Sequence, residues 1–104
     1  MIIAIVRFGL PHGLSLADAA RLYEQSAPNY RGLPGLLRKH YLFAEGVGGG
    51  VYLWESREAA EALYTPEWRR MIADRYGSEP EIQWFESPVT VDNAPASDLS
   101  PVLM

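Results

Sequence analysis

The stretch RKHYLFAEGVGGGVYLWES, residues 38–56, decides the fold of this chain. Two largely apolar segments, LLRKHYLFAE (36–45) and VYLWES (51–56), flank the glycine-rich GVGGG (46–50). This pattern predicts two strands joined by a loop that adopts positive φ wherever glycine stands. A phosphate-binding loop is the competing interpretation, but such loops lead into a helix N-terminus and carry Gly-Lys followed by Ser or Thr. Because this stretch leads into VYLW, the glycines are expected to shape a hairpin turn.

The residues on either side of the hairpin predict two further strands and two helical regions. Ser15 followed by Asp18 is close to a capping box at a helix start. Ser56 is a good helix N-cap, and Thr65 before Pro66 predicts the start of a second segment within the same region. The predicted strands cover residues 2–8 and 81–93, and the predicted helices cover residues 15–27, 56–65 and 66–76.

The order strand, helix, strand, strand, helix, strand predicts an α+β, ferredoxin-like βαββαβ sandwich with an antiparallel sheet. One layer of helices covers one face of such a sheet, so a monomer should carry polar residues on the other face. The first strand instead has Ile3 and Ile5 on one face and Ile2, Ala4 and Val6 on the other. We therefore expect an isologous homodimer in which two sheets enclose a dimeric α/β barrel.

The length and the composition limit the organisation of the chain. A chain of 104 residues supports one modest core, and we expect one domain over residues 1–92. Residues 93–104 have the proline and serine content of an extended C-terminal arm. The net charge of −4 provides no basic field for nucleic acid or an anionic membrane. The opening MIIAIV lacks the basic start and the cleavage site of a signal peptide, so a cytoplasmic protein is the default expectation.

The candidate binding residues are aromatic. Three tryptophans and six tyrosines are many for this length, and such residues commonly fill a core or a dimer interface. If the second helical region folds back over the sheet, Trp54, Tyr64 and Trp68 lie near one another, and Tyr23 of the first helix closes the other side. A largely apolar cavity of this kind suits a planar organic ligand. The aromatic residues are therefore expected either to fill the core or to line a ligand pocket.

The two histidines offer one candidate for acid–base chemistry. His40 lies in the middle of a predicted strand, where it is either a hydrogen-bonded packing residue or a catalytic base. His12 belongs to a turn far away in sequence. No carboxylate or third histidine stands at metal-ligand spacing with either residue, so no metal is expected.

The segment GLPGLLRKHYLFAEGVGGGVYLWESREAAEALY, residues 32–64, resembles the YdhR-like monooxygenases of the dimeric α/β-barrel superfamily, which includes the antibiotic-biosynthesis monooxygenases. The resemblance covers most of residues 1–92 and is most specific in GLPGLLRKHYL and YLWESREAAE. It implies a homodimer with a pocket between sheet and helices in each subunit. Trp54 matches a tryptophan of relatives that oxygenate aromatic polyketide-like substrates without flavin, haem or metal. Relatives that degrade haem use a histidine on the second helix, which TPEWRRMIADRY (65–76) lacks.

The resemblance thus implies a cofactor-independent monooxygenase that acts on an aromatic or enolisable small molecule such as an anthrone, quinol or phenol. His40 would be the catalytic base. The substrate-binding residues would be Arg38, Tyr23, Trp54, Tyr64 and Trp68. Strand parity puts His40 and Arg38 on one face of the sheet and Tyr41 on the other. The alternative is a non-catalytic dimer that binds a hydrophobic metabolite or a protein partner, with the aromatic residues serving only packing.

Overall fold

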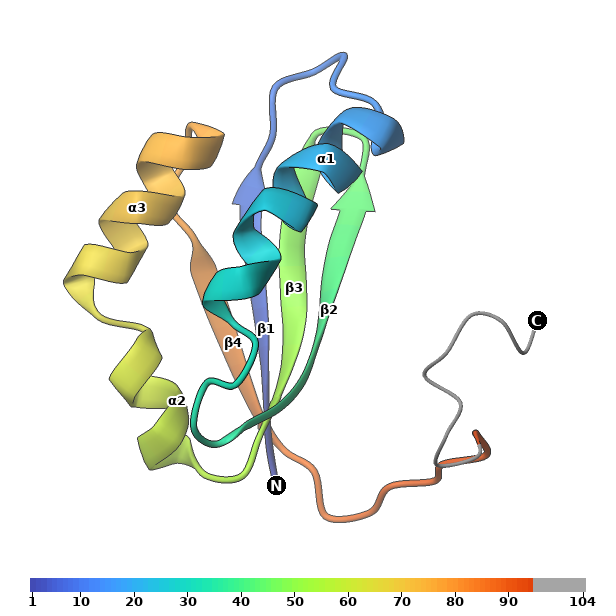
Figure 1. Cartoon of the computed structure of the whole chain (residues 1–104), viewed down its shortest axis with the longest axis vertical. Coiled ribbons are helices and arrows are strands. Elements are labelled where there is room, and N and C mark those ends of the chain that lie inside the picture. Colours follow the sequence, from blue (N-terminus) through green and yellow to red (C-terminus); the bar gives the residue numbers. More distant parts are fainter. Residues whose placement is uncertain (95–104) are drawn as a thin grey trace.

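An antiparallel four-stranded sheet with the strand order β2-β3-β1-β4 carries the helices on one face (Figure 1). The computed structural model describes residues 1–94. The architecture confirms the predicted α+β, ferredoxin-like fold. The strands are β1 (Ile2–Gly9), β2 (Leu36–Ala44), β3 (Val47–Trp54) and β4 (Glu81–Glu86). The helices are α1 (Leu16–Ser26), the 3₁₀ helix η1 (Ala27–Asn29), α2 (Arg57–Leu63) and α3 (Pro66–Tyr76).

The predicted N-caps begin the three α-helices. The Ser15 hydroxyl accepts a hydrogen bond from the backbone N–H of Asp18 at 3.1 Å, and the Asp18 carboxylate accepts one from the Ser15 N–H at 3.1 Å. This reciprocal pair is a complete capping box. The side chain of Ser56 caps α2 and that of Thr65 caps α3. Local sequence therefore determines where each helix starts.

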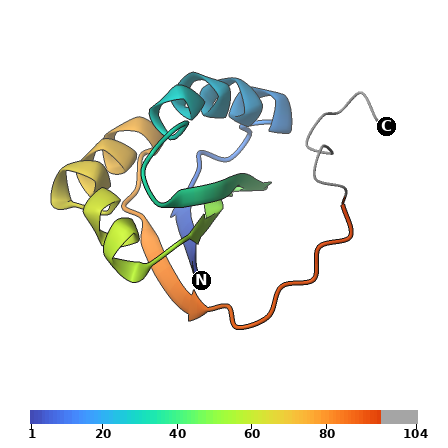
Figure 2. The same cartoon turned by 60° about the horizontal axis from the view of Figure 1, so that its bottom comes forward.

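The core lies between the helices and one face of the sheet. Ala4, Val6 and Phe8 of β1 are buried there, together with Tyr52 and Trp54 of β3. The other buried apolar residues of this layer are Leu10, Ala19, Tyr23, Tyr30, Ala60, Tyr64, Trp68, Ile72 and Tyr76. Figure 2 shows the helices as one layer beside the sheet. Burial of these large rings supplies much of the driving force for folding.

The glycine-rich stretch lies mostly in a strand, and the predicted loop over residues 46–50 is therefore wrong. The turn between β2 and β3 consists of residues 45 and 46, and Gly46 has φ 78° there. Gly48, Gly49 and Gly50 belong to β3 and pair with both β1 and β2. These three glycines are therefore part of the sheet, and only Gly46 shapes the turn.

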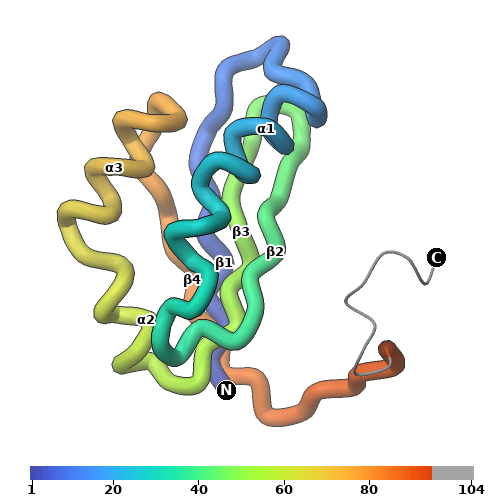
Figure 3. Tube along the Cα trace, in the orientation of Figure 1, coloured from blue at the N-terminus to red at the C-terminus, as the bar shows by residue number. Residues whose placement is uncertain are grey.

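Gly48 and Gly50 leave space for side chains that lie across β3. A Cβ atom added at Gly48 would lie 2.5 Å from the Tyr23 hydroxyl and 2.7 Å from Cε1 of Phe8. A Cβ atom added at Gly50 would lie 3.2 Å from Cε of Lys39. The missing side chains let α1 approach the sheet, and Figure 3 shows α1 passing over β3 and β2.

A β-bulge near the start of β2 changes which residues share a face. Leu36 pairs with Trp54, whereas the next paired residue of β2 is Arg38, so Leu37 is extra. Simple alternation would put Leu36 on the same face as Arg38. The bulge instead brings Leu36 to the helix-covered face, which it shares with Lys39.

The second face of the sheet, here called the open face, carries no described helix (Figure 2). Ile3 pairs with Leu53 and Ile5 pairs with Val51, so four aliphatic residues lie together at its centre. Phe85 of β4 pairs with Ile3 and is 44% exposed. The apolar residues predicted for this face are present, whereas the predicted dimer itself stays a prediction.

The fourth strand is shorter than the predicted range 81–93. The backbone N–H of Ser87 still donates a hydrogen bond to the Met1 carbonyl at 2.8 Å, but Pro88 has no N–H and pairing ends at Glu86. Residues 87–94 form no helix or strand. The predicted arm over 93–104 lies almost entirely outside the described residues, and the domain boundary at residue 92 stays a prediction. None of the described helices is long and apolar enough to cross a membrane.

Substitution Gly48→Ala tests the role of space on β3. The added methyl group collides with Tyr23 and Phe8, and overpacking of this kind costs about 1–3 kcal/mol of unfolding free energy. Urea unfolding followed by tryptophan fluorescence measures the loss. Val47→Thr, an exposed β-branched exchange on the same strand, should leave the unfolding free energy nearly unchanged. Equal stability of the wild type and Gly48→Ala would contradict the packing argument.

Candidate active site

Two of the three tryptophans of the helix-covered face are held by tyrosine hydroxyls. Nε1 of Trp54 donates a hydrogen bond to the Tyr64 hydroxyl at 3.1 Å, and Nε1 of Trp68 donates one to the Tyr30 hydroxyl at 3.1 Å. The Tyr64 and Trp68 rings lie 4.8 Å apart. The structure thus brings Trp54, Tyr64 and Trp68 together, as the sequence suggested. All three are buried, with Trp54 0% exposed, so they form a packed wall and not an accessible surface.

Tyr23 of α1 belongs to the same layer but lies at its other end. Its hydroxyl donates a hydrogen bond to the Leu42 carbonyl at 2.8 Å, and its ring stacks on Tyr41 with the centroids 4.6 Å apart. Tyr41 in turn shares a hydrogen bond of 2.7 Å with the Ser26 hydroxyl. Tyr23 also lines an interior void of about 10 Å³, which is large enough for about one water molecule.

Lys39 enters this aromatic layer from β2. Its Nζ atom lies 3.4 Å from the ring centroid of Tyr30, 3.8 Å from that of Tyr41 and 4.6 Å from that of Tyr52. Within residues 1–94, no carboxylate lies within ion-pair distance of this amine. Burial lowers the pKa of Lys39 to about 7, while the three ring faces favour the ammonium form. The amine therefore gains and loses its proton near neutral pH.

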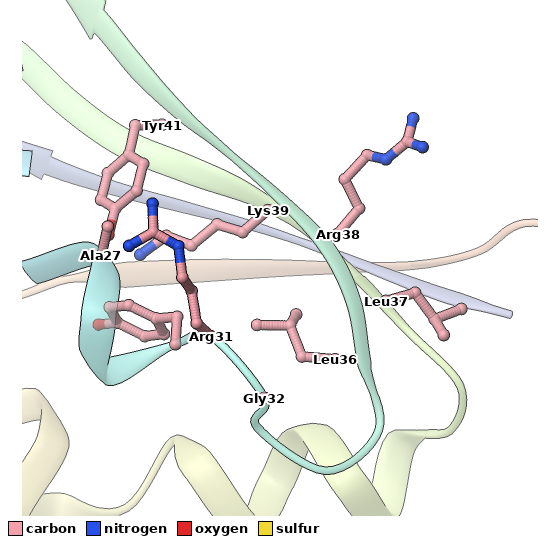
Figure 4. Close-up of a pocket in the computed structure, with 9 residues that line it drawn as sticks. Ala27, Arg31, Gly32, Leu36, Leu37, Arg38, Lys39 and Tyr41 are labelled. Carbon is pink, nitrogen blue, oxygen red and sulfur yellow. The ribbon is translucent and has the colours of Figure 1, made fainter. Parts of the chain in front are cut away.

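A groove of about 300 Å³ gives access to Lys39 between β2 and the segment from η1 to Gly32 (Figure 4). Its lining consists of Ala27, Tyr30, Arg31, Gly32, Leu36, Leu37, Arg38, Lys39 and Tyr41. We call it the η1–β2 groove. Tyr30, Lys39 and Tyr41 line both this groove and the interior void. The Lys39 side chain therefore lies at the boundary between the groove and the interior.

His40 and Arg38 lie on the open face and not in the aromatic layer. His40 pairs with Val51 and Arg38 pairs with Leu53, and both side chains are exposed. Figure 4 shows the Arg38 side chain directed away from the rest of the groove lining. The structure therefore separates the predicted base from Tyr23, Trp54, Tyr64 and Trp68.

Sequence reasoning missed Lys39. The available signal was its spacing of two residues from Tyr41, which puts both side chains on one face of a strand. A lysine on an aromatic, helix-covered face is unusual enough to indicate a site. As for metals, no three His, Cys, Asp or Glu side chains gather as a ligand group within residues 1–94.

Several solved structures share this fold. One is a proposed antibiotic biosynthesis monooxygenase from Deinococcus radiodurans, with a TM-score of 0.67, 16% identity, and coverage of 91% of this chain and 100% of that chain. Another is the cofactor-independent oxygenase SnoaB from Streptomyces nogalater, with a TM-score of 0.61, 20% identity, and coverage of 86% and 95%. A third is the monooxygenase ActVA-Orf6 from Streptomyces coelicolor in complex with nanaomycin D, with a TM-score of 0.64, 17% identity, and coverage of 89% and 92%. No protein-family model and no curated protein matches the sequence.

The unusual protonation of Lys39 should appear in the pH dependence of stability. Because burial lowers the Lys39 pKa from 10.5 to about 7, the unfolded chain binds one more proton than the folded chain between these values. The unfolding free energy should therefore rise with pH across this window, by up to about 1.4 kcal/mol per pH unit. The increase is smaller if the ring faces stabilise the ammonium form and so keep the pKa of Lys39 higher.

Lys39→Met removes this titration while keeping a flexible side chain of similar length. The difference in unfolding free energy between the wild type and Lys39→Met should therefore shift in favour of the wild type as the pH rises from about 7 to about 9. Urea unfolding at several pH values measures it. A difference independent of pH would show that Lys39 has an ordinary pKa.

Proposed function

We propose that the chain is a cofactor-independent monooxygenase that acts on an aromatic or enolisable small molecule of the anthrone, quinol or phenol type. The observation that carries this proposal is a lysine amine enclosed by three aromatic rings at the inner end of a groove, where burial lowers its pKa to about 7. Solved structures with the same fold include one described as a cofactor-independent oxygenase and one with nanaomycin D bound. The groove volume of about 300 Å³ is at the lower end of the range for small-molecule sites.

Lys39 is the proposed catalytic base in place of His40. Above its pKa of about 7 the amine is neutral and can take a proton from a phenolic hydroxyl or an activated methylene group. The ammonium that forms lies against the faces of Tyr30 and Tyr41, which stabilise positive charge. It also lies next to the new substrate anion, which it stabilises in surroundings of low polarity.

The anion supplies the electrons for the reaction with O₂. In the oxidation of a methylene carbon to a ketone, one oxygen atom becomes the carbonyl oxygen. The other oxygen leaves as water with the two methylene hydrogens. The substrate thus provides all four electrons that O₂ accepts, so the balance requires no further reductant. The chain's own part is to bind the ring, remove the proton and limit access of bulk water.

The second candidate function is the binding of a hydrophobic metabolite without turnover. The dense packing of Trp54, Tyr64 and Trp68 favours it, because these residues already have partners and need no ligand. Both functions use the η1–β2 groove. They differ in whether O₂ is consumed.

Measurement of O₂ uptake with an oxygen electrode, on metal-free and flavin-free protein, tests the oxygenase proposal. An anthrone should be consumed with one O₂ per substrate, and the rate should rise with pH through about 7 as Lys39 loses its proton. Lys39→Met should lower turnover about 10²-fold or more and remove the pH dependence. His40→Gln should change turnover little.

Loss of turnover in His40→Gln with retention in Lys39→Met would assign the base to His40. Tight binding without O₂ uptake across a panel of anthrones, quinols and phenols would favour the metabolite-binding function.

We also propose that the open face forms the interface of a homodimer. Its centre is aliphatic, whereas Arg38 lies on the edge strand β2 and Glu81, which pairs with Arg7 of β1, lies on the edge strand β4. A twofold axis that pairs opposite edges would therefore bring opposite charges together and cover the aliphatic centre. The face that lacks helices would then be buried without any further domain.

Light scattering tests the assembly. The wild type should have twice the chain mass of 11.6 kDa. Ile5→Glu places a charge at the centre of the open face and should dissociate the dimer, with unfolding if the monomer is unstable. Leu16→Glu changes a residue that is 66% exposed on α1 and should leave the mass unchanged. A monomeric wild type at micromolar concentration would rule out the dimer.

A further inference from the structure

We infer that the η1–β2 groove selects aromatic ligands that carry a carboxylate group, and that Arg31 binds this carboxylate at the groove mouth. The inference rests on the proposed function in treating this groove as the substrate site. It adds the charge of the substrate and a residue that recognises it. Arg31 is therefore a specificity-determining residue, distinct from the base Lys39.

The charge of the groove differs from that of the whole chain. The chain has a net charge of −4, yet the groove lining holds the cations Arg31 and Lys39 and no Asp or Glu, with the side chain of a third cation, Arg38, directed away from the groove. Three other surface hollows in the described part of the chain are each lined by at least one carboxylate residue. A cationic groove on an acidic protein favours an anionic ligand and disfavours a cationic one.

The backbone of Arg31 is fixed at the edge of the groove. Its backbone N–H donates a hydrogen bond to the Ala27 carbonyl at 3.2 Å, directly after η1. Figure 4 shows the Arg31 side chain extending toward Tyr41, on the same side of β2 as Lys39. Burial raises the pKa of Tyr41, and the positive charge of Arg31 acts in the opposite direction. Arg31 and Tyr41 line the same groove, so the guanidinium and the inner end of the groove can contact one ligand.

Within residues 1–94, no carboxylate pairs with Arg31. The described ion pairs of arginine are those of Arg21 with Asp18 and of Arg57 with Glu61. Guanidinium binds a carboxylate through two parallel hydrogen bonds, which gives direction as well as attraction. Leu36 and Tyr30 supply apolar walls for a ring next to this charge. The groove thus offers a ring-binding portion and a carboxylate-binding portion.

The Lys39 charge adds a pH dependence to this preference. The groups that face Lys39 are Tyr30 after η1, Tyr41 on β2 and Tyr52 on β3, and Arg31 shares the groove with it. The other titratable residues that share the interior void with Lys39 are Tyr23 and Tyr76. None of these neighbours carries a negative charge near neutral pH. A bound carboxylate therefore gains attraction when Lys39 is protonated, below a pKa of about 7.

Calorimetric binding of naphthoate and its neutral isostere naphthamide tests the inference without any turnover. Naphthoate should bind about tenfold more tightly than naphthamide to the wild type, which corresponds to about 1.4 kcal/mol. Its affinity should fall with added salt, and it should be weaker one pH unit above the Lys39 pKa of about 7 than one unit below it. Equal affinity of the two probes, or no binding of naphthoate, would overturn the inference.

Arginine variants test whether the preference for naphthoate depends on Arg31. Arg31→Gln should remove most of the preference for naphthoate, and Arg31→Lys should retain part of it. Arg70→Gln, which makes the same charge change on the outer side of α3, should keep the full preference. Circular dichroism confirms that each variant is folded. An unchanged preference in Arg31→Gln would contradict the assignment.

The two proposals fail in different ways. A preference for naphthoate that depends on Arg31, without O₂ uptake by any substrate, would leave the carboxylate site intact and exclude the oxygenase. Turnover of neutral anthrones with no preference for naphthoate would leave the oxygenase intact and exclude the carboxylate site.

Discussion

The missing side chains of Gly48 and Gly50 are the constraint on which the rest of the structure depends. They allow the Tyr23 hydroxyl and the Lys39 methylene groups to lie directly over β3. With larger residues at these positions, α1 would have to lie further from the sheet, and the Lys39 amine would not reach the rings around it. The glycine-rich stretch, which the sequence pattern predicts to be a loop, therefore sets the distance between the helices and the sheet.

The two most deeply placed tryptophans of the aromatic layer have hydrogen-bond partners, whereas the Lys39 amine has none among the described residues. The indole N–H groups of Trp54 and Trp68 each donate to a tyrosine hydroxyl, which removes the cost of burying an unpaired donor. Lys39 lacks an equivalent partner within the described residues and has only ring faces around its amine. A largely desolvated amine without a counter-ion opposes stability, and such groups occur preferentially at functional sites.

The sheet divides the possible roles of the chain between its two faces. Lys39 and His40 are adjacent in sequence, but strand geometry directs one toward the helices and the other toward the open face. Chemistry at the η1–β2 groove and association through the open face therefore use different residues. Because these residues differ, separate substitutions can test the groove chemistry and the dimer interface.

The sequence by itself determined the elements of the fold. Capping residues such as Ser15 and Thr65 act locally, and apolar strands act through a period of two, so the helix starts and the α+β order could be predicted from neighbouring residues alone. Sequence also identified Trp54, Tyr64 and Trp68 as a group. Tertiary structure decided that these three fill a packed wall, because only the contact between helices and sheet fixes which rings remain accessible.

Lys39 and the glycines of β3 show what local patterns could not supply. The glycines favour a turn locally, but the approach of α1 and Lys39 requires them within a strand. The lysine resembles any exposed lysine until the rings of Tyr30, Tyr41 and Tyr52 surround it. Both features arise from contacts between residues distant in sequence, and such contacts exist only when the layers are packed.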